Sequence, residues 1–387
     1  MFLDDLIDAA LSERREQHLL RVRRIVTPIS ATHVELEGVR LVNFASNNYL
    51  GLTHHPRMLD VPLDATGAGA AGLITGHTPD HASAETAIAS WKQTESAILL
   101  PSGYQANLAA IQTLSAVAES QGKSIRFIAD KLAHASLIDA IRQTGATLRV
   151  FPHNGIEKLE RLLAESEPDE MQVVVTESIF SMDGDAADLH AIASLKQKHG
   201  FVLLVDEAHG SGVYGPAGSG LVAELGLRDA VDVSIVTLSK ALGVSGGAVC
   251  ASKRFIDAVL NFGRAYIYST AISPYVARLV SRAIQILQTE PQHQSRVRSL
   301  ARRVRSELSA RFDLPAGDSP IIPIVLSHES RAIEEAKRLQ EAGMLVLPVR
   351  PPTVPKGTSR LRITLCSDHS DAEVGKLVES VMQIRLT

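Results

Sequence analysis

Lys240 is the residue whose position most directly suggests chemistry. It lies among small residues in TLSKALGVSGG (237–247), just after the apolar run VSIVTL (233–238). An arbitrary lysine more often packs its stem on apolar residues and reaches solvent with its amine. Burial and positively charged surroundings, however, lower the pKa of an amine and make it a nucleophile that forms Schiff bases.

Other polar residues follow apolar runs in the same way. Asp206 and His209 end or follow FVLLVD (201–206), and His134 comes after SIRFIA (124–129). In open parallel sheets, ligands bind outside the carboxyl ends of the strands, where side chains from several strands converge. An acid, two histidines and a lysine at such ends favour a cofactor site, although Asp206 alone would also suit a helix cap.

Two nucleotide-binding interpretations of VDEAHGSGVYG (205–215) fail. An ATPase needs the loop G-x-x-x-x-G-K-[ST] after an early strand, but the nearest match, VAESQGKS (117–124), begins with Val117 and precedes a strand. The dinucleotide fingerprint fits GAGAAG (67–72) and GSGVYG (210–215), yet neither opens the helix that would bind a pyrophosphate. We therefore predict that both glycine clusters are turns.

Metal-binding and hydrolase motifs are weak as well. HTPDH (77–81) has two histidines four residues apart, but Pro79 argues against the helix that would align them. MDGDAAD (182–188) lacks the rest of a twelve-residue calcium loop, and there is no G-x-S-x-G elbow. We expect no metal site.

Composition restricts the class of protein further. Of the 387 residues, 45% are hydrophobic and 21% charged, and the net charge of -4 gives no reason to expect a nucleic-acid partner. Cys250 and Cys366 are too few for a disulfide framework. The acidic N-terminus does not fit a secretory signal, and no stretch approaches the roughly 18 apolar residues of a membrane span. We expect a cytoplasmic protein without a membrane partner.

The elements that would position these residues alternate along the chain. Short apolar runs, separated mostly by helical patterns, are predicted to be strands over residues 96–100, 124–129, 147–151, 172–177, 201–206, 233–238 and 247–251. Strands that are apolar on both faces, with helices between them, indicate an α/β protein with a mainly parallel, seven-stranded sheet covered on both sides.

The flanking segments complete the predicted organisation. We expect an amphipathic helix over residues 3–24 and a hairpin within 34–44, around a Glu-Gly pair. The predicted domains are an N-terminal segment (1–45), a large domain (46–275) and a smaller C-terminal α/β domain (276–387), which begins with a long helical stretch.

The polar strand ends suit pyridoxal phosphate. This cofactor needs a lysine for its Schiff base, an acid beside its pyridine nitrogen, a surface against its ring and donors for its phosphate. Lys240 and Asp206 match the first two needs, His209 could reach the phenolic oxygen, and His134 could cover the ring. Backbone N–H groups where PSGY (101–104) opens a helix would bind the phosphate.

Eight motifs now give a specific resemblance. ESIFSMDGD (177–185), VDEAHGSGVYGPAGSG (205–220) and TLSKALGVSGG (237–247) carry most of it. The others are NFASNNYLGLTHHP (43–56), PSGYQANLAA (101–110), HASLIDAIRQTGA (134–146), YSTAISP (268–274) and RPPTVPKGTSRLRITL (350–365). Their order along the chain is that of the α-oxoamine synthases, which the chain therefore resembles and which are fold-type I pyridoxal-phosphate enzymes with a large and a small domain.

The resemblance implies roles for individual residues. Lys240 would bind the cofactor and move the substrate Cα proton, with Asp206 on the pyridinium and His134 on the ring. The implied cofactor-binding residues are Gly103, Tyr104, His134, Ser181, Asp206, His209, Thr237, Lys240, Ser269 and Thr270. Ser269 or Thr270 would complete the neighbouring subunit's site, because such enzymes are homodimers with shared active sites. The implied substrate-binding residues are Arg21, Asn47, Thr353 and Arg362.

Spacing alone does not establish the substrate-binding residues. Arg360 and Arg362 point the same way from a strand, so only the resemblance selects Arg362 as the carboxylate-binding residue. Turn chemistry would explain Asn47 or Thr353 equally well. Arg21 belongs to a basic cluster that would also suit the end of a helix.

The reaction implied by the resemblance is a decarboxylative condensation of an amino acid with an acyl thioester. PHNG (152–155) and the 350–365 motif favour the members that join L-alanine to a pimeloyl thioester in biotin biosynthesis, with coenzyme A or a carrier protein as the carrier. Glycine C-acetyltransferase, 5-aminolevulinate synthase, serine palmitoyltransferase and a non-catalytic scaffold remain alternatives. GAGAAGLITGH (67–77) has alanines where the family often has polar residues, which leaves the acyl chain open.

Overall fold

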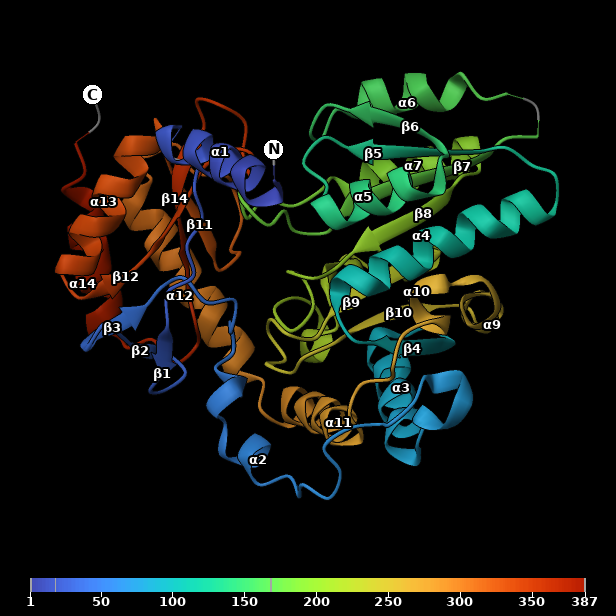
Figure 1. Ribbon diagram of the computed structural model, residues 1–387, viewed down its shortest axis with the longest axis horizontal. Coiled ribbons are helices and arrows are strands. Elements are labelled where there is room, and N and C mark those ends of the chain that lie inside the picture. The colour runs from blue at the N-terminus through green and yellow to red at the C-terminus, as the bar shows by residue number, and fades with distance from the viewer. Residues whose placement is uncertain (1, 18, 168, 386–387) are drawn as a thin grey trace. The chain divides into compact units, whose positions relative to one another are not determined.

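The computed structural model describes residues 2–17, 19–167 and 169–385, which form two compact units (Figure 1). The larger unit contains residues 50–181 and 185–296, and the smaller unit contains the remaining described residues. The predicted domain boundaries after residues 45 and 275 stay a prediction, because compactness alone does not define a domain that folds by itself.

The larger unit is built on the predicted seven-stranded, mainly parallel sheet. Neighbouring strands follow the order β4-β10-β9-β8-β7-β5-β6, and β10 alone runs opposite to the other six. The strands are β4 (Ser96–Leu100), β5 (Ile125–Asp130), β6 (Thr147–Phe151), β7 (Met171–Glu177), β8 (Val202–Asp206), β9 (Val233–Thr237) and β10 (Gly247–Ala251). Each apolar run recognised in the sequence forms one of these strands.

Helices cover the sheet because its strands are apolar on both faces. α4 (Gly103–Ser120), α5 (Ala135–Thr144) and α9 (Lys253–Phe262) share one core with alternate residues of the strands (Figure 1). The other α-helices of this unit are α2 (Pro56–Leu59), α3 (Pro79–Lys92), α6 (Ile156–Ala164), α7 (Leu189–His199), α8 (Leu221–Glu224), α10 (Arg264–Ile267) and α11 (Pro274–Thr289). Short helical turns are η1 (Leu52–His54), η2 (Gly72–Gly76), η3 (Pro216–Gly218) and η4 (Arg228–Ala230).

The smaller unit contains two small sheets. The first has the order β1-β2-β3-β12, with β1 (Val26–Pro28), β2 (His33–Leu36), β3 (Val39–Asn43) and β12 (Met344–Leu345). The second is antiparallel and has the order β11-β14-β13, with β11 (Ile321–Ser327), β13 (Leu347–Val349) and β14 (Ser359–Thr364). The helices are α1 (Leu3–Glu16), most of α12 (Gln292–Leu308), α13 (Glu329–Glu341) and α14 (Asp371–Met382).

The local predictions for the smaller unit were partly correct. The predicted hairpin is β2–β3, and its turn residues Glu37 and Gly38 have φ angles of 54° and 78°, as tight hairpin turns require. The predicted helix over 3–24 was too long: α1 ends at Glu16 and buries no residue. The backbone N–H groups of Leu19 and Leu20 both bond to the Arg14 carbonyl oxygen, so the chain leaves the helix.

A buried ion pair joins α3 to the loop after β8. Lys92 and Glu207 are 2% and 1% exposed, and Lys92 Nζ lies 2.5 Å from Glu207 Oε2. Lys92 also donates to Ser211 Oγ, and Glu207 Oε1 accepts from the Val222 N–H at 3.0 Å. Because both charges are out of water, each depends on the other for stability.

Lys92→Met should lower the free energy of unfolding by about 3 kcal/mol, because Glu207 would keep a buried charge without its cation. Urea denaturation would measure this loss. The double variant Lys92→Met/Glu207→Gln should recover part of it, because no charge is then buried. An equal loss in both variants would contradict the electrostatic explanation.

Candidate active site

The predicted cofactor residues of the larger unit gather where neighbouring strands end. Asp206 is the last residue of β8 and Thr237 the last of β9, while His134 caps α5 shortly after β5. β5, β7, β8 and β9 are consecutive, parallel strands, so their carboxyl ends share one edge of the sheet. Lys240 follows β9 in a turn at the same edge.

A chain of hydrogen bonds connects Asp206 to His134. Asp206 is 4% exposed, and its carboxylate accepts from Asn107 Nδ2 at 2.8 Å and from the Ala208 N–H at 2.9 Å. Asn107 Nδ2 also donates to Ser136 Oγ at 2.8 Å, and this hydroxyl lies 2.7 Å from His134 Nδ1. Two predicted residues are therefore brought together by two that the sequence did not single out.

Asn107 is one residue that reasoning from the sequence missed. It lies in the second turn of α4, four residues after Gly103, on the buried side of the helix. The signal was a polar residue within the otherwise apolar stretch NLAAI (107–111). A buried amide in such a stretch indicates a polar partner on the facing element.

The protonation of His134 follows from its surroundings. Burial lowers its pKa, Asp206 acts in the opposite direction, and the Lys240 charge lowers the pKa again. The Ser136 N–H donates to His134 Nδ1 at 3.2 Å, so a neutral imidazole carries its proton on Nε2. Neutral His134 can therefore donate a hydrogen bond from Nε2 to a carbonyl oxygen.

Glu177, a second missed residue, is the register partner of Asp206 on β7. Its side chain is 2% exposed, and Oε1 has no hydrogen-bond partner. Burial and the charge of Asp206 raise its pKa well above the ordinary value, against the effects of Lys240 and of a bond from the His134 backbone. This raised pKa favours the neutral form of Glu177, whose strand partner Asp206 lies beside it at the same edge of the sheet.

The backbone at the start of α4 is packed too closely for any side chain at Gly103. A Cβ added there would lie 2.1 Å from Thr237 Oγ1, and one added at Gly247 would lie 2.5 Å from the Gly103 nitrogen. Ser102 caps the helix by accepting from the Gln105 N–H at 3.2 Å. The N-terminus of α4 beside a threonine hydroxyl suits the phosphate that the sequence predicts here.

The remaining cofactor candidates lie in loops of the larger unit. Ser181 and His209 are buried, in the loops after β7 and β8. Tyr104 is 44% exposed and its hydroxyl bonds to Asp139, while Ser269 accepts from Gln105 Nε2 at 3.3 Å. Thr270 forms an isolated bridge with Ala71. The roles of these five candidates stay predictions.

The smaller unit brings the predicted substrate residues together in pairs. Arg362 is 3% exposed and donates to Asn47 Oδ1 and to Thr364 Oγ1, both at 3.0 Å. The Tyr49 hydroxyl also bonds to Asn47 Oδ1, at 3.1 Å. Arg21 Nη2 lies 3.2 Å from Thr353 Oγ1.

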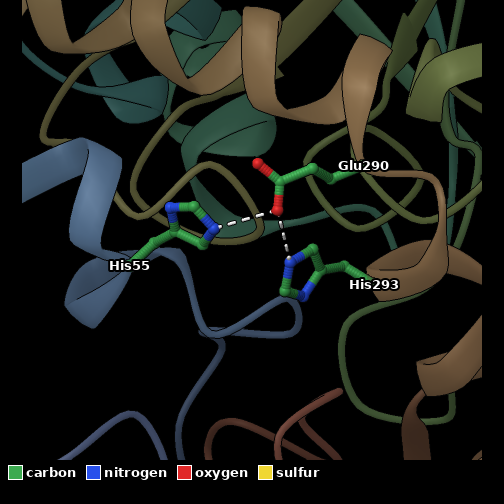
Figure 2. Close-up of side chains that lie close together, drawn as sticks. All are labelled: His55, Glu290 and His293. Carbon is green, nitrogen blue, oxygen red and sulfur yellow. Dashed lines mark hydrogen bonds and ion pairs between the residues drawn. The ribbon is translucent and has the colours of Figure 1, made fainter.

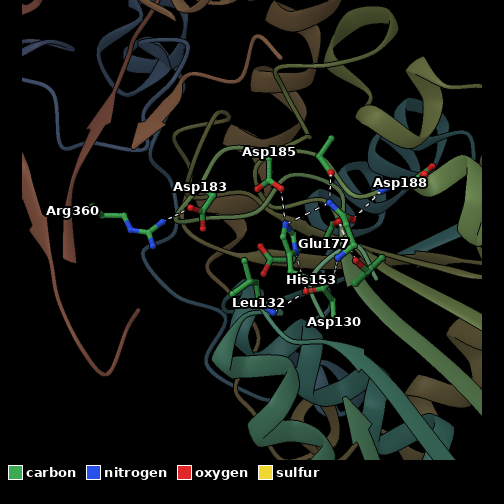
Figure 3. Close-up of polar contacts among 11 residues, drawn as sticks. Asp130, Leu132, His153, Glu177, Asp183, Asp185, Asp188 and Arg360 are labelled. Carbon is green, nitrogen blue, oxygen red and sulfur yellow. Dashed lines mark hydrogen bonds and ion pairs between the residues drawn. The ribbon is translucent and has the colours of Figure 1, made fainter. Parts of the chain in front are cut away.

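Arg360 and Arg362, which the sequence could not separate, have different partners. The Arg360 guanidinium forms an ion pair with Asp183 and donates to the Thr358 carbonyl (Figure 3). Arg362 instead bonds to an amide and a hydroxyl oxygen. This difference supports the choice of Arg362 for a substrate carboxylate, although its role stays a prediction.

His55, Glu290 and His293 form a further polar cluster, in which both histidines point at one carboxylate (Figure 2). His55 Nε2 lies 3.1 Å from Glu290 Oε2, and Arg57 lies 2.7 Å from Oε1. The Arg57 N–H donates to His55 Nδ1, so this nitrogen is already engaged and Nε2 faces the carboxylate. The cluster fits an ion-pair network, and the expected absence of a metal stays a prediction.

Gly103→Ala should lower the free energy of unfolding by about 2 kcal/mol, because the new Cβ would collide with Thr237 Oγ1. Denaturation by urea would measure the loss. Gly103→Ala/Thr237→Ala should recover much of this loss by removing the hydroxyl. A Gly103→Ala variant as stable as the original protein would contradict the close approach.

Known proteins are similar to almost the whole chain. The family model of aminotransferase class I and II matches residues 39–381. The Klebsiella pneumoniae 8-amino-7-oxononanoate synthase is 41% identical over 382 residues, which cover 96% of this chain and 97% of that protein.

Solved structures are also similar to most of this chain. The S. paucimobilis serine palmitoyltransferase with a bound PLP–myriocin aldimine has a TM-score of 0.90 at 29% identity, covering 98% of this chain and 97% of its own. The Francisella tularensis 8-amino-7-oxononanoate synthase has a TM-score of 0.73 at 25% identity, covering 88% and 96%. These similarities confirm the resemblance found in the sequence, and the chain belongs to the aminotransferase class I and II family.

Proposed function

We propose that the chain is a pyridoxal-phosphate-dependent acyltransferase that condenses L-alanine with a pimeloyl thioester. The products are 8-amino-7-oxononanoate, carbon dioxide and the free thiol of coenzyme A or a carrier protein. The observation that carries the proposal is the hydrogen-bonded chain from Asp206 to His134 at the strand ends. The curated relatives' name supports the biotin-pathway reaction, and a neighbour solved with PLP supports the cofactor.

The residues at the strand ends fit this cofactor. Asp206, held by two donors, suits a protonated pyridine nitrogen. The start of α4 and the Thr237 hydroxyl suit a phosphate, and the missing side chain at Gly103 lets the backbone approach it. Lys240 supplies the amine for the aldehyde. When bound, the cofactor supplies an electron sink for negative charge at the substrate Cα.

The chain's own residues then bind, orient and transfer protons. Asp206 keeps the ring nitrogen protonated, and Asn107 fixes the direction of that carboxylate. The Lys240 amine accepts the proton from the substrate Cα and returns it after carbon dioxide leaves. His134 donates from Nε2 to the carbonyl oxygen of the β-keto acid, which favours decarboxylation. Ser181 and His209 bond to the phenolic oxygen of the ring.

Arg362 binds the carboxylate of alanine in this proposal. A guanidinium forms two parallel hydrogen bonds with a carboxylate, which fixes orientation as well as affinity. Asn47 holds the guanidinium at 3.0 Å and is itself held by Tyr49. Burial raises the pKa of Tyr49 to about 12 against the effect of Arg362, so its hydroxyl stays a donor to Asn47. Arg21 and Thr353 contact the rest of the substrate.

A cytoplasmic homodimer with shared active sites completes the proposal. Ile74 and Tyr268 are 76% and 74% exposed, in the segments next to the isolated bridge of Ala71 and Thr270. Large exposed apolar side chains mark interaction surfaces. Ser269 and Thr270 would complete the neighbouring subunit's phosphate site. Within the described residues, no helix is both long and apolar enough to span a membrane.

Another α-oxoamine synthase activity is the second candidate. The structural similarity to serine palmitoyltransferase, with a TM-score of 0.90, exceeds that to the Francisella synthase, at 0.73. The apolar, exposed Leu73 and Ile74 also lie in the segment where the sequence departs from the family. Both observations concern acyl-chain choice and leave the cofactor chemistry unchanged.

Release of free coenzyme A should be fastest when alanine is combined with pimeloyl-coenzyme A. The assay pairs alanine, glycine and serine with pimeloyl-, acetyl-, succinyl- and palmitoyl-thioesters, and kcat/KM is compared across the matrix. Glycine or serine outperforming alanine would overturn the substrate assignment in favour of another α-oxoamine synthase.

Lys240→Ala is the control for the cofactor part of the proposal. The loaded protein should keep its cofactor through denaturation after borohydride treatment, because reduction makes the lysine bond permanent. Lys240→Ala should lose it, whereas Lys253→Ala should not, because Lys253 is exposed and pairs with Asp257. Retention of the cofactor by denatured, reduced Lys240→Ala would rule out Lys240 as the attachment site.

A further inference from the structure

His153, in the PHNG motif after β6, has no part in the reaction proposed above. Its Nδ1 lies 3.1 Å from Asp130 Oδ1, and its Nε2 lies 2.6 Å from Asp185 Oδ2 (Figure 3). We propose that His153 is a positioning residue, an imidazolium that fixes Asp130 and Asp185 and so holds the two loops that carry His134 and Ser181.

The loop that leads to His134 is built on the Asp130 carboxylate. Asp130 is the last residue of β5 and is 1% exposed. Besides His153, its oxygens accept from the Leu132 N–H at 2.8 Å and from the Asn154 N–H at 3.0 Å. A change in the direction of this carboxylate would therefore shift the backbone immediately before His134.

The loop that carries Ser181 is closed by Asp185. The Phe180 N–H donates to the Asp185 carbonyl oxygen at 2.9 Å, and Ile179 forms a bridge with Ala186. The Phe180 ring stands edge-on to His153, with ring centroids 4.4 Å apart. His153 therefore contacts Asp185 and Phe180, which lie at the two ends of the loop. Phe180 directly precedes Ser181.

Asn154 reinforces the same connection. Its Nδ2 donates to the Ala186 carbonyl oxygen at 3.0 Å, and its Oδ1 accepts from the Asp188 N–H at 3.2 Å (Figure 3). His153 and Asn154 thus join the end of β5 to the loop after β7 through their side chains and the Asn154 N–H. This gives the PHNG motif a physical role.

The carboxylates of Asp130 and Asp185 require a charged His153. Both carboxylates accept hydrogen bonds, so both ring nitrogens of His153 must donate. Only the imidazolium can donate from both nitrogens. Partial burial would lower the pKa of His153, but the bonds to Asp130 and Asp185 and their charges outweigh it and raise the pKa to about 10. Glu177 also faces Asp130, and burial and the charge of Asp206 raise its pKa well above the ordinary value, which favours its neutral form.

Amide hydrogen exchange of the cofactor-free protein tests the loops directly. His153→Gln should exchange faster in peptides covering 131–136 and 178–181, because glutamine cannot donate toward both carboxylates at once. The loop 207–214 should be unchanged. His190→Gln, at an exposed position of α7, is the matched control and should match the original protein. If the exchange rate in His153→Gln changed equally in all peptides, the positioning role would be overturned, whether or not the melting temperature also fell.

The link to the cofactor rests on the proposed function and is measured separately. The dissociation constant of pyridoxal phosphate should rise about tenfold in His153→Gln, as expected when one charge-assisted hydrogen bond no longer orients the site. An unchanged constant would contradict the inference. Failure of the original protein to bind the cofactor would instead refute the proposed function, while loop-specific exchange in the cofactor-free protein would still support the role of His153 in holding the loops.

The pH dependence of stability gives an independent measurement. The pKa of His153 is raised in the folded state, so its stabilisation is complete below the ordinary histidine value of about 6.5 and is lost as the pH rises through about 10. The difference in urea midpoint between the original protein and His153→Gln should therefore shrink across this range. In Asp185→Asn, the stabilisation by His153 should be lost at a lower pH. A difference that does not change with pH would overturn the charged clamp.

Discussion

The buried carboxylate of Asp206 is the interaction on which the rest of the site depends. An ionised carboxylate inside a protein is tolerated only when hydrogen-bond donors replace its water. Asn107 on α4 and the Ala208 backbone supply them. The same amide of Asn107 continues through Ser136 to His134, so satisfying one charge also fixes the ring that would cover the cofactor.

A second constraint follows, because several acids end neighbouring strands. Glu177 and Asp206 are register partners, and Asp130 ends the strand next to Glu177. Burial and the charge of Asp206 raise the pKa of Glu177, which favours its neutral form, and the His153 imidazolium balances Asp130 together with Asp185. Crowding of acids at this edge is thereby reduced around Asp206, the residue proposed to meet a pyridinium.

The sequence predicted the strands well because their apolar character is local. Six strands of the large sheet are buried on both faces, so a short apolar run was sufficient, whereas the edge strand β6 is mostly exposed. MLVLPV (344–349) is one apolar run in the sequence but splits into β12 and β13, which belong to different sheets, and only tertiary pairing distinguishes them. For the same reason Asn107 and Glu177 were missed, since their importance comes from partners far along the chain.

The contrast between Arg360 and Arg362 shows how structure separates what spacing cannot. Both side chains lie on the same face of β14, two residues apart, and both are buried. Asp183 neutralises Arg360, whereas Asn47 orients Arg362 without opposing its charge. A carboxylate ligand gains more from a cation oriented by a neutral amide than from one already paired with an acid. In the proposed function, recognition of the amino-acid carboxylate falls to Arg362 and Asn47, neither of which belongs to the hydrogen-bonded chain from Asp206 to His134.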